Sequence, residues 1–128
     1  MQNRNIILFV DDEKICHTLV ELIIPNFTQY KLISAFNSEE ALSLAERYAN
    51  NLLLVITDIM LPDFNGYELY KKIKTNKKLQ EVPFIFQSGL ESQEAELKKH
   101  ISDNVKILYK PYTQADLLQS ITSSLNVN

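Results

Sequence analysis

The sequence predicts an α/β fold in which five parallel strands form one sheet with helices on both faces. Short apolar runs rich in β-forming residues recur five times, and each is followed by a longer stretch with the apolar period of a helix. Strands that alternate with helices in this way form a doubly wound parallel sheet. The length of 128 residues, 45% of them apolar, fits one domain that buries its own core.

Five segments have the composition of strands. Each is short, rich in β-branched, aromatic or other apolar residues, and bounded by polar or turn-forming residues. They are residues 6–10, 30–36, 52–57, 82–87 and 105–109. The longest uninterrupted apolar runs, IILFV and LLLVI, contain five residues each, far fewer than the roughly 20 that cross a bilayer. Membrane insertion is therefore not expected.

Five further segments have helical periodicity. They are residues 14–24, 39–49, 66–76, 91–100 and 113–125. The second has an apolar stripe on one side, made of Ala41, Leu42, Leu44, Ala45, Tyr48 and Ala49. Residues typical of helix caps open two of them: Ser38 precedes Glu39 and Glu40, and Thr113 stands three residues before Asp116. No internal repeat interrupts this order, so residues 1–128 are expected to form a single domain.

Composition and charge exclude several classes of protein. The net charge of −3 argues against a nucleic-acid partner, because binding to the phosphate backbone needs a concentrated positive surface. The single cysteine, Cys16, cannot form an internal disulfide, which is typical of a reducing compartment. No charged-then-apolar leader opens the chain, so a soluble cytoplasmic protein is expected. With only Gly66 and Gly89, the chain has no glycine-rich phosphate cradle.

Polar side chains follow four of the five predicted strands. They are Asp11 and Asp12 after the first strand, Asp58 after the third, Ser88 after the fourth and Lys110 after the fifth. Ligands of open parallel sheets bind beyond the carboxyl ends of the strands. If the strands take the order 2-1-3-4-5, the first and third are neighbours at the switch point, and these side chains share one crevice.

The chemistry of this set suits a phosphoryl group. Three neighbouring carboxylates raise one another's pKa, and a hard divalent cation resolves the conflict; Mg²⁺ takes one or two carboxylates together with waters and a phosphate oxygen. Lys110 adds a compact positive charge, and the Ser88 hydroxyl can donate a hydrogen bond. Phosphoryl transfer needs positioning and charge neutralisation above all, so Asp58 is predicted to be the nucleophile that forms an acyl phosphate.

Taken in order, these residues resemble the receiver domain of bacterial two-component response regulators. The resemblance rests on four motifs: the acidic pair in VDDE, the DIMLPDFNG run with its proline four and its glycine eight residues after Asp58, FQSG at the fourth strand end, and YKP. They occur in the family's order and at family-like spacing across essentially the whole chain. The resemblance implies the flavodoxin-like (βα)5 fold with strand order 2-1-3-4-5.

The resemblance also implies roles for individual residues. Asp58 would accept the phosphoryl group from the phosphohistidine of a histidine kinase or of a histidine phosphotransfer protein. The remaining assignments are Asp11, Asp12, Asp58 and the backbone carbonyl of Met60 for Mg²⁺, and Ser88 and Lys110 for the phosphoryl oxygens. A cis peptide bond is expected at Lys110–Pro111.

The sequence departs from the family pattern at the third position before Lys110. The family usually has an aromatic residue there, which turns inward when the hydroxyl residue moves, whereas this chain has Ile107. A branched aliphatic side chain has no ring to swing between buried and exposed positions. Tyr109 shares the same face of the predicted strand and is a candidate to carry part of the signal.

Several functions remain open from the sequence. The leading interpretation is a stand-alone receiver, a signalling module rather than an enzyme, that binds an unidentified downstream protein or passes its phosphoryl group along a relay. The alternatives are a receiver excised from a larger regulator or hybrid kinase, an unphosphorylated scaffold, and an aspartate-nucleophile phosphohydrolase. The last is disfavoured because Met60 occupies the position of a general-acid aspartate.

The two histidines are expected to have no catalytic role. His17 is expected on the first helix as a surface or half-buried side chain. His100 closes the fourth helix, where a cation suits the helix C-terminus. Cys16 and His17 do not form a metal site, because neighbouring residues point to different sides of a helix.

Overall fold

The computed structural model describes residues 3–101 and 105–125, and the strands in these ranges form one parallel sheet in the order β2-β1-β3-β4-β5. The strands are β1 (Ile6–Val10), β2 (Lys31–Ala35), β3 (Leu52–Asp58), β4 (Phe84–Ser88) and β5 (Lys106–Tyr109). The α-helices are α1 (Lys14–Phe27), α2 (Ser38–Arg47), α3 (Gly66–Lys74), α4 (Glu91–His100) and α5 (Gln114–Leu125). The predicted fold class and strand order are confirmed.

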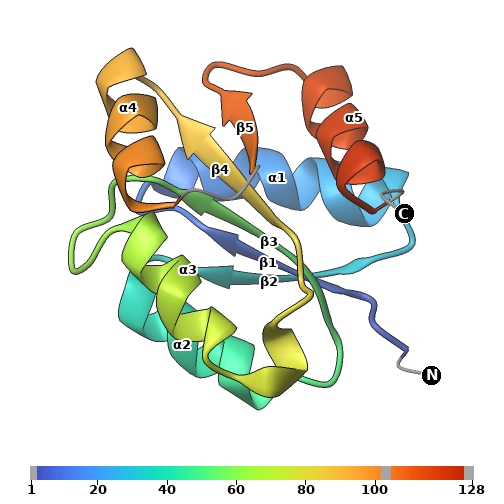
Figure 1. Cartoon of the computed structure of the whole chain (residues 1–128). Coiled ribbons are helices and arrows are strands. Elements are labelled where there is room, and N and C mark those ends of the chain that lie inside the picture. Colours follow the sequence, from blue (N-terminus) through green and yellow to red (C-terminus); the bar gives the residue numbers. More distant parts are fainter. Residues whose placement is uncertain (1–2, 102–104, 126–128) are drawn as a thin grey trace.

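The helices cover both faces of the sheet (Figure 1) and enclose two separate cores. Side chains alternate between the faces of a strand, so Leu8 and Val10 of β1 pack toward α2, α3 and α4, whereas Ile7 and Phe9 pack toward α1 and α5. All five residues of β1 are buried. A strand that is buried on both faces has a continuous apolar sequence rather than an alternating one, and this accounts for the sequence IILFV of β1.

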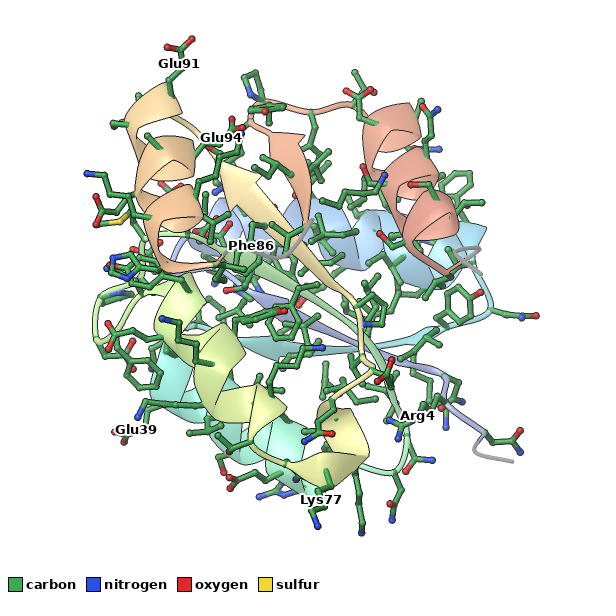
Figure 2. All side chains as sticks on the ribbon, viewed as in Figure 1. Arg4, Glu39, Lys77, Phe86, Glu91 and Glu94 are labelled. Carbon is green, nitrogen blue, oxygen red and sulfur yellow. The ribbon has the colours of Figure 1, made fainter. Side chains whose placement is uncertain are left out.

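The interior of the molecule is largely apolar and its surface carries most of the charged side chains, as expected for a sheet covered on both faces. Figure 2 shows Phe86 of β4 inside the molecule, while Glu39, Lys77 and Glu91 project from its periphery. Phe86 is fully buried and its ring stacks on that of Phe84, with ring centroids 5.7 Å apart. Within the described ranges, no helix is long and apolar enough to cross a membrane.

Element boundaries differ from the sequence expectation mainly at the helix ends. Helix α1 continues past residue 24 to Phe27 with Pro25 inside its last turn. Helices α2 and α3 end earlier than expected, at Arg47 and Lys74. The carboxyl end of every strand lies within one residue of its predicted position.

Two of the described α-helices begin with side-chain caps. The cap of α2 is Asn37, one residue before the expected Ser38: its side chain accepts a hydrogen bond from the Glu40 backbone N–H at 2.8 Å. The predicted pair at α5 is confirmed, since Thr113 and Asp116 each accept at 3.0 Å from the other's backbone N–H.

The strand register brings the strand ends together. Val10 pairs with Thr57, Asp58 with Gln87, and Ser88 with Tyr109. The residues that follow β1 and β5 are therefore next to the last residues of β3 and β4. This edge of the sheet holds the candidate site.

Candidate functional site

Three carboxylates gather where β1 and β3 end. Ligand oxygens of Asp11, Asp12 and Asp58 all lie within 4.8 Å of one another. Asp11 is fully buried and Asp58 is 7% exposed, whereas Asp12 is exposed. The Oδ1 atom of Asp11 accepts a hydrogen bond from the backbone N–H of Glu13 at 2.9 Å, which fixes the orientation of the Asp11 side chain.

Lys110 connects two of these carboxylates from the end of β5. Its Nζ lies 2.9 Å from Oδ2 of Asp11 and 3.0 Å from Oδ1 of Asp58. The Lys110 backbone N–H donates to the carbonyl oxygen of Ser88 at 2.8 Å, which fixes the chain where β5 leaves the sheet. The Lys110–Pro111 peptide bond is cis, as the motif implied.

Gln87 is a site residue that the sequence reasoning missed. It is 1% exposed, and its Nε2 donates to Oδ2 of Asp11 at 3.1 Å and to Oδ1 of Asp58 at 2.9 Å. Its Oε1 accepts a hydrogen bond from the hydroxyl of Tyr112 at 2.5 Å. The available signal was a glutamine directly after the apolar residues FIF of this strand, together with a tyrosine just after the YKP motif.

Burial and charge set the ionisation of the site. Burial raises the pKa of Asp58 to about 7, and the charge of Asp11 adds to this rise while Lys110 opposes it. Burial also opposes ionisation of Asp11, but the N–H of Glu13 and the ammonium of Lys110 outweigh it and lower its pKa. The pKa of Lys110 is raised, because the two carboxylates outweigh its own burial. A site with more negative charge than Lys110 neutralises favours a hard cation.

Ser88 is the last residue of β4, and Met60 lies on the loop after β3. Ser88 is buried, and its hydroxyl donates to the carbonyl oxygen of Leu90 at 2.8 Å, so the hydroxyl is turned toward the loop between β4 and α4. Met60 follows Asp58 by two residues and is 46% exposed. Leu90, two residues after Ser88 on the loop between β4 and α4, is 63% exposed.

Gly66 allows the loop after β3 to close against the site. Its backbone N–H donates to the carbonyl oxygen of Ile59 at 2.7 Å. A Cβ at this position would lie 2.2 Å from the carbonyl oxygen of Asp58. The glycine in the DIMLPDFNG run is therefore required by the close approach of its backbone to that of Asp58.

His17 is buried, which corrects the expectation of a surface or half-buried side chain. It is 2% exposed, stacks on Phe36 with ring centroids 3.9 Å apart, and places Nε2 2.7 Å from the carbonyl oxygen of Asp11. Neighbouring Cys16 belongs to a second group of potential ligands with Asp11 and Glu13. Burial and the charge of Asp11 raise the pKa of Cys16 to about 11, which disfavours its thiolate form.

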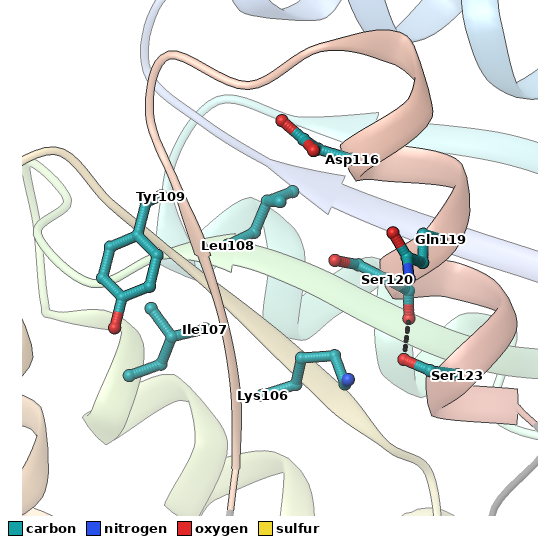
Figure 3. A pocket seen from close by; sticks show the side chains of 8 residues that line it. All are labelled: Lys106, Ile107, Leu108, Tyr109, Asp116, Gln119, Ser120 and Ser123. Atoms are coloured by element: carbon teal, nitrogen blue, oxygen red, sulfur yellow. Dashed lines mark hydrogen bonds between the residues drawn. The ribbon is translucent and has the colours of Figure 1, made fainter.

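A groove of about 410 Å³ runs between β5 and α5 and contains none of the acidic residues of the site. Figure 3 shows Ile107 and Tyr109 on one side of β5 and Leu108 on the side that faces α5. Tyr109 is 56% exposed, and its hydroxyl donates to Oε1 of Glu94 on α4 at 2.7 Å. The expectation that Tyr109 and Ile107 share a strand face is confirmed.

Comparisons with known proteins agree with this geometry. A family model described as the response regulator receiver domain matches residues 7–122. The chain is 32% identical over 127 residues to the response regulator SaeR of Staphylococcus aureus, covering 93% of this chain and 50% of SaeR. It is 37% identical over 94 residues to the probable transcriptional regulator ycf29 of Pyropia yezoensis, covering 73% of this chain and 41% of that protein. The chain thus spans about half the length of these relatives or less.

Solved structures share the fold. The chemotaxis response regulator CheY4 of Vibrio cholerae superposes with a TM-score of 0.83 at 22% identity, covering 95% of this chain and 99% of that one. The receiver domain of a sensor histidine kinase from Pseudomonas aeruginosa has a TM-score of 0.83 at 21% identity, covering 97% of this chain and 99% of its own. That structure has a magnesium ion coordinated in its active-site cleft.

Proposed function

The chain belongs to the response regulator receiver domain family of two-component signal transduction, and we propose that Asp58 is its phosphoacceptor. The observation that carries this proposal is the position of Asp58 at the end of β3, beside Asp11 and Lys110 and within ligand distance of Asp12. Among the described residues, the donors that contact Asp58, Lys110 and Gln87, both reach its Oδ1. Its other oxygen is available to bond phosphorus.

We infer that the acidic group holds Mg²⁺. Carboxylate oxygens within 4.8 Å of one another fit the all-oxygen coordination of this ion, and the Met60 backbone carbonyl is proposed as a further ligand. When bound, Mg²⁺ would neutralise charge on the carboxylates and on the incoming phosphoryl oxygens. Asp12 suits this role because it is exposed and, among the described residues, makes no hydrogen bond that would fix it elsewhere.

The residues of the chain then position the transfer. Lys110 already bridges Asp11 and Asp58 at about the place where a phosphoryl oxygen would need a positive charge. Ser88 reaches the phosphoryl group once its hydroxyl leaves the carbonyl of Leu90. The phosphorus–oxygen bond forms at Asp58 while the bond to the donor breaks, so the protein supplies geometry and charge rather than a further covalent step.

The partner proposed for this reaction is a histidine kinase or a histidine phosphotransfer protein. Helix α1, which begins beside the site, exposes Ile15, Leu19 and Leu22 at spacings of four and three residues. Such a row suits packing against a helix of another protein. It supports a protein phosphodonor, and the chain would act as a phosphorylation-controlled module in the cytoplasm rather than as an enzyme on other substrates.

Phosphorylation with a small donor tests the proposal directly. Incubation with acetyl phosphate and Mg²⁺, followed by intact-mass measurement, should show one added phosphoryl group. The group should be absent from Asp58→Ala and from wild type treated with a chelator. A phosphorylated Asp58→Ala protein would show that the acceptor lies elsewhere.

Calorimetric titration tests the metal site separately. Asp12→Ala is expected to weaken Mg²⁺ binding strongly while leaving the fold intact, because the side chain is exposed. Binding should also weaken as the pH falls and the carboxylates take up protons. Wild-type affinity in Asp12→Ala would remove Asp12 from the coordination shell.

A further inference from the structure

Gln87 contacts the reactive carboxylate but has no part in the function proposed so far. It is buried near the carboxyl end of β4, where an uncharged polar side chain must have its hydrogen bonds satisfied. All of its polar atoms are used: Nε2 donates to Asp11 and Asp58, and Oε1 accepts from Tyr112. The site therefore contains a built hydrogen-bond chain from Tyr112 to Asp58.

The direction of each hydrogen bond in this chain is fixed. Asp11 pairs with the Lys110 ammonium and accepts from the Glu13 N–H, so it acts as an acceptor toward Gln87 as well, and the side of the amide that faces the two carboxyl groups must be the NH₂ group. Oε1 then faces Tyr112, and the tyrosine hydroxyl must be the donor in the 2.5 Å hydrogen bond. Tyr112 thus holds the amide in the one orientation that presents both N–H groups to the carboxylates.

The donors are distributed unevenly over the two oxygens of Asp58. Gln87 Nε2 at 2.9 Å and Lys110 Nζ at 3.0 Å both contact Oδ1. In the described part of the chain, Oδ2 receives no such contact. Phosphorus would therefore bond to Oδ2, and Oδ1 would remain the carbonyl oxygen of the acyl phosphate with Gln87 still beside it.

We propose that Gln87 is a catalytic residue for loss of the phosphoryl group from Asp58, and that Tyr112 positions it; this inference rests on the proposed phosphoacceptor role. In hydrolysis, the Oδ2–phosphorus bond breaks and its electron pair stays on the Asp58 carboxylate. Water supplies the new oxygen on phosphorus and releases a proton. The charge that returns to the carboxylate spreads onto Oδ1, where the Gln87 N–H stabilises it.

Formation and loss of the acyl phosphate should respond differently to this hydrogen bond. In a loose transition state, the bond between Oδ2 and phosphorus is largely broken, so the carboxylate carries nearly its full charge. The Gln87 hydrogen bond therefore stabilises the free carboxylate and the transition state about equally, and the acyl phosphate less. Removing it should slow phosphoryl loss and leave the rate of phosphorylation nearly unchanged.

The test compares decay and formation in matched variants. Gln87→Met keeps the length of the side chain and removes its N–H donors. After phosphorylation with acetyl phosphate and Mg²⁺ and removal of the donor, intact mass should show loss about tenfold slower than in wild type, the factor that corresponds to about 1.4 kcal/mol. The formation rate at saturating donor should change by less than about twofold.

The positioning role of Tyr112 is tested by removing one tyrosine hydroxyl at a time, from Tyr112 in the site and from Tyr109 outside it. Tyr112→Phe removes the hydroxyl that orients the amide and should slow loss by about threefold, or roughly 0.7 kcal/mol. Tyr109→Phe removes a hydroxyl bonded to Glu94 outside the site and should decay like wild type. The double variant Gln87→Met/Tyr112→Phe should decay like Gln87→Met alone, because Tyr112 acts through the amide.

Several results would overturn the inference. These are wild-type decay in Gln87→Met, equal slowing of formation and decay, or equal decay of the two tyrosine variants. Tyr112→Phe changes one oxygen only, so it decides the question even where Gln87→Met fails to fold. A wild-type protein that takes up no phosphoryl group would instead contradict the proposed function.

Discussion

Asp58 ends a buried strand beside a second carboxylate, so its ionisation costs folding free energy at neutral pH. Without Mg²⁺, burial and Asp11 raise its pKa to about 7, against about 3.9 in an unfolded chain. Between these values, the folded protein holds a proton that the unfolded protein has released. Stability therefore falls as the pH rises through this window. Asp11 has a lowered pKa and loses its proton below the window.

Asp58→Asn should remove this cost. With chelator present, urea unfolding at pH 8 should show the variant more stable than wild type by roughly 2–4 kcal/mol, since each pKa unit corresponds to about 1.4 kcal/mol. The difference should close as the pH falls toward about 4, and saturating Mg²⁺ should reduce it at pH 8. A wild type that is the more stable protein at pH 8 without metal would contradict the raised pKa.

Met60 and Leu90, two residues after Asp58 and Ser88 respectively, are expected to lengthen the life of the phosphorylated state. Hydrolysis needs a water in line with the phosphorus–oxygen bond, and neither Met60 nor Leu90 can hydrogen-bond such a water strongly. Both are substantially exposed, so substitution should not disturb the core. Replacing Met60 by Asn and Leu90 by Glu should speed phosphate loss at saturating Mg²⁺, measured by intact mass. Decay at the wild-type rate or slower would show that shielding does not set the lifetime.

The sequence identified those site residues that follow strands, and it missed one that lies within a strand. Asp11, Asp58 and Lys110 could be placed together because the carboxyl ends of parallel strands share one edge. Gln87 could not, because its contact with Asp58 depends on the pairing register of β3 and β4. The burial of His17 likewise depends on rings from β1 and the loop after β2, which helical periodicity does not report.

The loop between β3 and α3 depends on the absence of a side chain at Gly66. A Cβ there would lie 2.2 Å from a backbone oxygen, which cannot move aside as a flexible side chain could. Gly66→Ala should therefore lower the free energy of unfolding by about 1–3 kcal/mol, although alanine is the better helix former at the start of α3. Urea unfolding measures the change.

Gly89 provides the matched control for this substitution. A Cβ at Gly89 would meet nothing within 4 Å, and neither glycine has a positive φ. Gly89→Ala should therefore leave stability within about 0.5 kcal/mol of wild type. Equal losses in the two variants would show that backbone packing at Gly66 is not the cause.

The elements themselves were largely predictable because local patterns determine them, whereas their ends depend on single hydrogen bonds. The apolar run of β1 and the capping pair at Thr113 and Asp116 are visible in the sequence. The cap of α2 is not settled by composition, since Asn37 and Ser38 are both good caps. Ser38 instead donates its backbone N–H to Asp63 at 2.9 Å, a contact that only the folded loop provides.

At the scale of the whole molecule, hydrogen bonds connect the site to α4 through β5. The carbonyl of Ser88 accepts from the Lys110 backbone N–H, Tyr109 pairs with Ser88 in the sheet, and the Tyr109 hydroxyl donates to Glu94. Ile107 lies on the same face but has no polar group to form such a link. Tyr109 is therefore positioned to transmit a movement of the β4 end that Ile107 could only follow by packing.

Phosphorylation is expected to shift a pre-existing equilibrium along this route. The Ser88 hydroxyl would leave the Leu90 carbonyl for a phosphoryl oxygen, which draws the β4–α4 loop toward Asp58. Amide exchange should therefore change mainly in residues 88–101 and 105–112, and Ser88→Ala should abolish most of the difference. Tyr109→Phe should still be phosphorylated but should lose the change in α4, because its bond to Glu94 is gone. Changes confined to α1, or an unaltered α4 response in Tyr109→Phe, would place the switch elsewhere.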